Sequence, residues 1–149
     1  RAETKEVRPA GAEEAAQDMT RDTKAFTAAI RNRVFIFLRA VVVGDFEAAL
    51  TTLSLPNDAD GQPWSADRLR KAMEEYHLDH ERICLDPNAR NARHTYAIPS
   101  DDKRSWRVQQ MLVDPAEHND WVAEFEVDLA GSRAAGDPVW QLRRLGRLA

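Results

Sequence analysis

The stretch "LVDPAEHNDWVAEFEVDLAGS", residues 112–132, decides the fold, because a turn at Asp114-Pro115 leads into an alternation of apolar and polar residues. The apolar positions in this alternation are Trp121, Ala123, Phe125, Val127 and Leu129. Between them lie Glu124, Glu126 and Asp128. A period of two residues is typical of a β-strand with one face on a core and the other largely in water.

Three further segments have strand character: residues 94–98, 105–113 and 138–148. They are separated from one another and from the strand at 120–129 by "PSDDKR", "DPAEHN" and "AGSRAAGD". Parallel strands need a crossover of a dozen residues or more, so connections this short predict antiparallel neighbours. We therefore expect a four-stranded meander, with a further short strand considered within residues 83–90, before the Asp86-Pro87 turn.

The residues before the sheet have helical periodicity. From about Glu13 to Val43, one predicted helix face carries Phe26, Ile30, Val34, Phe37, Leu38 and Val41. Phe35 and Ile36 lie outside that face, which suggests cover on more than one side. Asp45 is the expected N-cap of a short helix over residues 46–53, and Ser65 is the expected N-cap of a third helix. One face of this third helix carries Leu69, Ala72, Met73, Tyr76 and His80.

Helices followed by an antiparallel meander define the α+β class. A cone-shaped fold like that of nuclear transport factor two is the first candidate, and another arrangement of helices on a curved sheet is the second. Residues 1–18 are expected to be a linker or frayed segment and residues 19–149 a single domain. Because the chain starts at Arg1 rather than Met, we expect it to be the C-terminal part of a longer polypeptide.

The composition is that of a globular domain, with 149 residues, 43% hydrophobic and 31% charged. The longest apolar stretch, residues 34–43, is interrupted by Arg39 and is shorter than the roughly 20 residues of a membrane span, so no membrane partner is expected. Cys84 is the single cysteine, which excludes an internal disulfide and fits a reducing compartment. A cytoplasmic location is the default expectation.

No catalytic motif is found in the sequence, so whether the chain is an enzyme is left open. Phosphate-binding loops such as GxxxxGK[ST] and GxGxxG are missing, as is the GxSxG nucleophile turn. Glu124, Glu126 and Asp128 are spaced by about 6.7 Å along a strand, which suits paired carboxylates or a divalent ion. The favoured interpretation of these three residues is a solvated strand face.

Metal binding is considered for His77 and His80, which lie three residues apart on a predicted helix. Cys84 and His94 are conceivable further ligands, but their spacing matches no zinc-site pattern. We therefore predict no metal site. His80 is interpreted as a packed histidine and Cys84 as a small buried apolar residue.

Two basic strips lie within a chain of net charge −4. Residues 24–43 and 138–149 contain no acidic residue. The candidate nucleic-acid-binding residues in these strips are Arg31, Arg33, Arg39, Arg143 and Arg144. The acidic total weakens this hypothesis, because nucleic-acid affinity comes largely from phosphate neutralisation, and arginines covering the edges of helices and strands are the favoured alternative.

Three parts of the sequence, taken together, resemble the uncharacterised C-terminal domain of bacterial DEAD/DEAH-box helicases of superfamily two. They are "KAFTAAIRNRVF" (24–35), residues 105–148, and, between them, Trp64, Tyr76 and His80. The most specific parts are Asp114-Pro115, Asp120-Trp121 and "EVDL" at 126–129. The resemblance implies a parent ATP-dependent RNA or DNA helicase whose motor, with its ATP and magnesium, lies upstream. It implies no catalytic residue and no cofactor for these residues.

Three hypotheses for the function follow. The first is a non-catalytic accessory domain that docks on the helicase core or helps to bind RNA or DNA. The second is a small-molecule-binding or enzymatic domain, with a pocket lined by Tyr96, Trp106 and Trp121 in the cone-shaped sheet. The third is a module for homodimerisation or partner docking through the exposed sheet face or the first helix.

Overall fold

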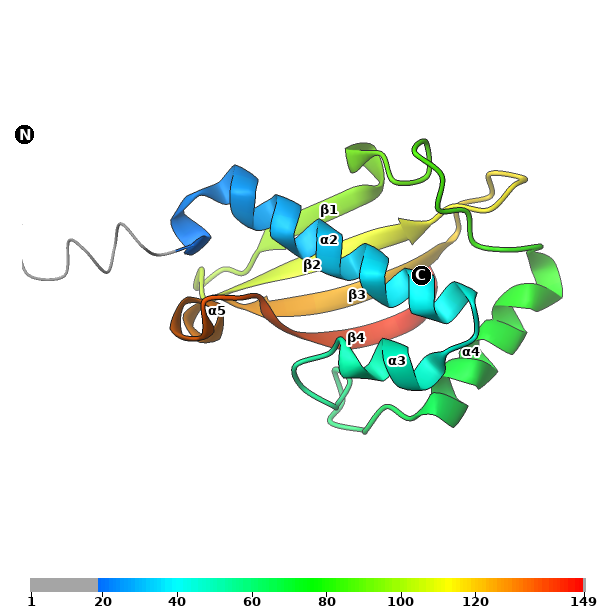
Figure 1. The fold of residues 1–149 in the computed structure, drawn as a ribbon, viewed down its shortest axis with the longest axis horizontal. Helices are drawn as coiled ribbons and strands as arrows, with labels where there is room; N and C mark the ends of the chain where they lie inside the picture. The colour runs from blue at the N-terminus through cyan, green and yellow to red at the C-terminus, as the bar shows by residue number, and fades with distance from the viewer. Residues whose placement is uncertain (1–18, 149) are drawn as a thin grey trace, which may run out of the picture.

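The computed structural model describes residues 19–148 and has the α+β architecture that the sequence predicts, with helices followed by an antiparallel meander (Figure 1). Its elements are the 3-10 turn η1 (Met19–Arg21), α2 (Thr23–Val42), α3 (Phe46–Thr51), α4 (Ala66–Asp79), the 3-10 turn η2 (Ala92–His94), β1 (Thr95–Pro99), β2 (Ser105–Leu112), β3 (Trp121–Asp128), α5 (Leu129–Ala135) and β4 (Val139–Arg147). The strand order is β1-β2-β3-β4. The predicted N-terminal linker, 1–18, lies outside the described residues.

The helices begin at side-chain caps. Asp45 and Ser65 cap α3 and α4, as predicted, and accept hydrogen bonds from Ala48 N and Arg68 N at 3.1 Å each. Within the described residues, the first long helix begins at Thr23, later than predicted, because Asp22 accepts a hydrogen bond from Ala25 N and η1 precedes it. None of the helices in residues 19–148 combines the length and apolar character that a membrane span requires.

The main core lies between α2 and one face of the sheet (Figure 1). The predicted apolar face of α2 is buried, and Phe35 is buried as well. The Phe37 ring meets the Phe125 ring edge-on at 5.5 Å, and Phe26 meets Trp106 at 5.2 Å. Aromatic rings therefore contribute to the packing between helix and sheet.

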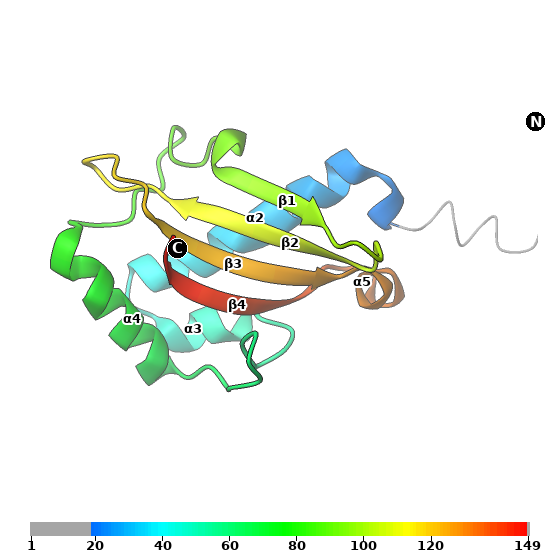
Figure 2. The same cartoon turned by 180° about the vertical axis from the view of Figure 1, so that it is seen from behind.

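The opposite face of the sheet carries no helix (Figure 2). On this face, Gln109 of β2 pairs with Glu124 of β3, which pairs with Arg144 of β4. The β3–β4 ladder is shifted between Glu124 and Phe125, so β4 has one extra residue, Arg143, at this point. Such a bulge turns consecutive side chains toward the same face.

Two local predictions are wrong. Residues 83–90 form no strand; they run through bends and a turn, in which Asp86 O accepts from Arg90 N at 3.0 Å. The connection after β3, expected to be a loop, contains α5. Asp128 caps this helix by accepting from Gly131 N at 3.1 Å, and Gly136, at φ +71°, ends it, so local capping overrides the continued apolar alternation at Leu129.

Candidate functional site

A surface hollow of about 400 Å³ lies between α2 and the segment that leads into β1. It is lined by Ala28, Arg31, Asn32, Phe35, Pro87 and Arg90. Two of these six residues are arginines, and they come from segments about 60 positions apart in the sequence, since Arg31 and Arg90 differ by 59. We call this feature the basic hollow.

Arg31 holds the two sides of the basic hollow together. Its guanidinium donates to the carbonyl oxygen of Arg90 and, at 3.4 Å, to Thr95 Oγ1. The same group lies 5.6 Å from the centre of the Phe35 ring, within the range of a cation–π contact. Arg31 is therefore positioned by three contacts within the lining of the hollow.

The electrostatics of the basic hollow follow from the composition of its two segments. Residues 24–43 contain no acidic residue, and neither do residues 87–100. The flanking Asp86 is used locally, because its Oδ1 accepts from Ala89 N at 2.9 Å. Lys24, Arg39 and Arg90 are exposed, and among residues 19–148 their side chains have no ion-pair partner. Positive charge is thus locally uncompensated although the whole chain is acidic.

The other predicted arginines are differently placed. Arg33 forms an ion pair with Asp137, beyond the end of α5. Arg143 lies on the helix-free face of the sheet and forms ion pairs with Glu124 and Glu126. Arg144 is 3.9 Å from Glu124. The structure therefore brings Arg31 together with Arg90, which sequence reasoning missed, and places Arg143 and Arg144 elsewhere.

The acidic residues of β3 do not form the uniformly solvated column that the alternation predicted. Glu124 is buried, with 7% of its surface exposed, and accepts from Gln109 Nε2 at 2.7 Å. Glu126 accepts from Arg143 at 2.8 Å. Asp128 is exposed and caps α5. Long side chains on the strands beside β3 cover Glu124, which is why its polar position is not a solvated one.

The three predicted pocket residues are not brought together. Trp106 packs against Phe26 on the helix-covered face of the sheet. Trp121 is fully buried, with its ring edge-on to Tyr76 at 5.2 Å. Tyr96 pairs with Gln109, so it points to the helix-free face, where it is about half exposed.

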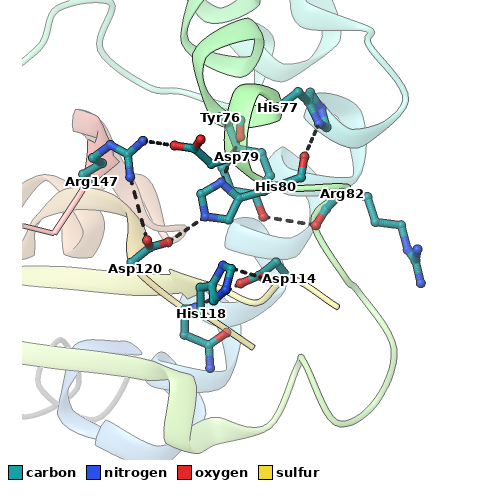
Figure 3. A network of polar contacts seen from close by, with 10 residues as sticks. Tyr76, His77, Asp79, His80, Arg82, Asp114, His118, Asp120 and Arg147 are labelled. Carbon is teal, nitrogen blue, oxygen red and sulfur yellow. Dashed lines mark hydrogen bonds and ion pairs between the residues drawn. The ribbon is translucent and has the colours of Figure 1, made fainter. Parts of the chain in front are cut away.

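A second polar cluster lies at the end of α4 (Figure 3). The His80 ring stacks on Tyr76, its Nδ1 is 2.9 Å from Tyr76 O, and its Nε2 is 2.7 Å from Asp120 Oδ1. Burial lowers the pKa of His80, but these hydrogen bonds and the charges of Asp120 and Asp114 outweigh it, so the net effect is a raised pKa. The prediction that His80 is packed is confirmed.

The same cluster contains potential metal ligands. His80, Asp114 and His118 each offer one ligand atom, and the three atoms lie within 4.8 Å of one another. His77 lies in the last turn of α4, and its Nδ1 is 3.3 Å from the carbonyl oxygen of His80, the residue that follows the helix. Sequence reasoning overlooked Asp114 and His118 because they lie more than 30 positions from His80. Cys84 is half-buried, and burial raises the pKa of its thiol, which keeps it protonated.

The chain matches the model of a protein family. The family model described as a domain of unknown function, DUF3516, matches residues 1–145, which is nearly the whole chain. Searches of curated proteins and of solved structures gave no match.

Proposed function

The chain belongs to the DUF3516 family, and we propose that this domain is a non-catalytic accessory module that binds the sugar-phosphate backbone of RNA or DNA beside a helicase motor. The proposed contact surface is the basic hollow together with the exposed cations of α2. Binding of this kind is independent of base sequence, because phosphates carry the charge and no sequence information.

One observation carries the proposal: two segments without acidic residues, 24–43 and 87–100, meet at the basic hollow. In this chain of net charge −4, other cations have acidic partners, as Arg70 does with Asp67 and Glu74. Within residues 19–148, Arg31 and Arg90 at the hollow form no ion pair. Unpaired arginines are suited to phosphates, because the planar guanidinium donates two parallel hydrogen bonds to an oxyanion.

The geometry of α2 supports contact with several phosphates. Lys24, Arg31 and Arg39 are spread over fifteen residue steps of one helix. At 1.5 Å per residue, this separation is about 22 Å, which covers several nucleotides of a single strand. Arg90 adds a second cation beside Arg31 from the other wall of the hollow.

The link to a helicase rests on the resemblance of residues 24–35 and 105–148 to the C-terminal domain of DEAD/DEAH-box helicases. We propose that the parent motor binds ATP and magnesium and that this domain retains or guides the strand that the motor moves. No residue of the domain is assigned a role in ATP hydrolysis.

The experiment is fluorescence anisotropy of the chain with labelled single-stranded RNA and DNA over a salt series. Arg90→Ala and Arg39→Ala are each expected to weaken binding and to reduce the slope of log affinity against log salt by about one, because each variant neutralises one phosphate fewer. Arg31→Lys keeps the charge but loses the forked hydrogen bonding. Arg70→Ala on α4 is the control, because it removes the same charge from an exposed position that is paired with Asp67 and Glu74.

The proposal requires Arg90→Ala to differ from Arg70→Ala. Equal losses of affinity in the two variants would show that only net charge matters, and absence of binding at low salt would reject the nucleic-acid role. In the full-length protein, the same two variants compared for RNA-stimulated ATPase would then test whether the domain acts on the motor.

A docking role is the second candidate, favoured by apolar exposure at the end of α2. Ile36, Val42 and Val43 are 39%, 41% and 72% exposed. A helicase core or a second copy of the chain is the partner this surface would take. Light scattering of the wild type and of Val43→Asp at high concentration tests homodimerisation; a wild-type monomer would leave the motor as the partner to examine.

A further inference from the structure

We propose that His80, Asp114 and His118 form a binding site for a divalent transition-metal ion, with Zn²⁺ as the best-matched ion. The site is separate from the basic hollow and does not depend on the proposed nucleic-acid function. His80 follows α4, whereas Asp114 and His118 belong to the turn between β2 and β3, so an ion would join two parts of the fold (Figure 3).

His80 has the orientation of a metal-binding imidazole. Its Nδ1 lies 2.9 Å from the Tyr76 carbonyl oxygen and donates a hydrogen to it, and its ring stacks on the Tyr76 ring with 10° between the planes. A histidine whose Nδ1–H is bonded to a backbone carbonyl holds Nε2 in a fixed direction, and here Nε2 donates to Asp120 Oδ1 at 2.7 Å until an ion takes the place of its proton. Only 1% of the His80 side chain is exposed, so this orientation is held by packing.

Asp114 is a buried carboxylate that lacks a Lys or Arg partner within residues 19–148. It is 2% exposed, and its Oδ1 accepts from Asn119 N at 2.9 Å. Its Oδ2 lies 3.7 Å from His118 Nδ1. Buried carboxylates are normally paired with cations or coordinate metals, and here the two nearby imidazoles are suited to share a metal ion with the carboxylate.

The three candidate ligand atoms need to move only slightly closer together to bind one ion. Ligands at 2.0–2.2 Å from a tetrahedral zinc ion lie about 3.4 Å from one another, compared with the present limit of 4.8 Å. His118 is the ligand able to move, because its side chain is 57% exposed and lies on a turn. Asp120 Oδ1 lies 2.7 Å from His80 Nε2 but is not one of the three ligand atoms that lie within 4.8 Å of one another.

The ligand chemistry selects the class of ion. Two imidazole nitrogens and one carboxylate oxygen suit zinc and its neighbours in the first transition series, whereas calcium and magnesium prefer oxygen ligands throughout. Binding of the ion to His80 Nε2 replaces the proton that Nε2 otherwise shares with Asp120. The bound ion would tie the end of α4 to the β2–β3 turn and stabilise the folded chain.

The test uses the chain itself with ZnCl₂ or CoCl₂ as the only added ligand. Isothermal titration calorimetry should show one Zn²⁺ per chain, and Co²⁺ should give the visible ligand-field bands of a four-coordinate site with nitrogen ligands. His118→Ala should weaken binding by at least about tenfold. It alters an exposed side chain, so it should fold, which circular dichroism will verify.

His77→Ala is the matched control, because His77 is an exposed histidine of α4 that lies outside the cluster. It should bind Zn²⁺ as the wild type does. Nitrogen-15 spectra of the histidine rings add an independent readout, in which Zn²⁺ should shift the His80 Nε2 and His118 ring resonances. Absence of saturable one-to-one binding, equal affinity in His118→Ala, or shifts confined to His77 would each overturn the proposal.

Discussion

Arg143 and Glu124 form an ion pair across the β3–β4 ladder, on the sheet face that no helix covers, with Arg143 Nε 3.5 Å from Glu124 Oε1. The side chains are only 22% and 9% exposed, respectively. Arg143 is the extra residue of the bulge, which turns it toward Glu124 and Glu126 together. Its role is therefore to pair with the buried carboxylate of Glu124 and the partly exposed carboxylate of Glu126.

Arg143→Ala should lower the free energy of unfolding by about 1–3 kcal/mol, because Glu124 then loses its closest cation while remaining buried. Arg144→Ala, whose side chain is 41% exposed and 3.9 Å from Glu124, should cost less than about 1 kcal/mol. Urea unfolding of both variants measures the difference. A larger loss of stability in Arg144→Ala would contradict this assignment, and neither variant should reduce RNA affinity as much as Arg90→Ala.

Trp64→Phe should destabilise the fold through one buried hydrogen bond. The indole Nε1 of Trp64 donates to Leu142 O at 2.8 Å, and this bond joins the loop before α4 to β4. Removal of the donor leaves the carbonyl oxygen unsatisfied, at a cost of about 1–3 kcal/mol in addition to the weaker packing. Trp106→Phe is the control, since within residues 19–148 its indole makes no hydrogen bond. Thermal unfolding should show the larger destabilisation in Trp64→Phe.

The Asp58–Arg68 pair should make the free energy of unfolding depend on pH in the acidic range. The pKa of Asp58 is held below its ordinary value of 3.8, mainly by the hydrogen bond that Arg68 donates at 2.6 Å. A second hydrogen bond, from the backbone amide of Gln62, lowers the pKa further. Because the pKa is lower in the folded state, the stabilisation is present above pH 3.8 and is lost as the pH falls through the pKa of the folded protein.

Urea midpoints of the wild type and Asp58→Asn, measured from neutral pH to about pH 2, test this expectation. The difference in urea midpoint between the two proteins should be largest at neutral pH and should decrease in the most acidic range. Asp60→Asn, an exposed carboxylate in the same loop, should show no comparable change. A difference that stays constant over the whole range would refute the role of the Asp58 charge.

Gly136→Ala should destabilise the chain by about 1 kcal/mol for conformational reasons alone. Gly136 ends α5 at φ +71°, and an added Cβ would meet no atom within 4 Å. Gly136→Asn should cost less, because asparagine tolerates the left-handed region. Gly146→Ala in β4, where φ is not positive and the nearest contact is an ordinary 3.6 Å, is the control. Equal unfolding temperatures for the wild type and Gly136→Ala would be evidence against the αL cap.

Local patterns were sufficient for most of the fold. The period of two predicted β2, β3 and β4, and cap residues such as Asp45 and Ser65 marked helix starts, because both signals come from neighbouring residues. Helix α5 was missed because its cap, Asp128, also fits the strand alternation. The apolar triplet at 83–85 suggested a strand, but Pro87 follows it and Cys84 makes only a single ladder-like bond, from its N to Val113 O.

The candidate site was less predictable. The sequence indicated basic strips, and Arg31 and Arg39 remain candidates in the structure. It gave no reason to join Arg90 to Arg31, or to separate both from Arg143, because those relationships depend on which segments the sheet and α2 bring together.

By itself, the sequence determined the α+β order, the buried face of α2 and the alternation of β3, since periodicity and capping act over a few residues. Only the tertiary structure decided which charges are neutralised, why Glu124 is buried, and that His80 meets Asp114 and His118. The physical reason is that ion pairs and ligand clusters depend on distances of a few ångströms between residues far apart in the chain, and packing sets those distances.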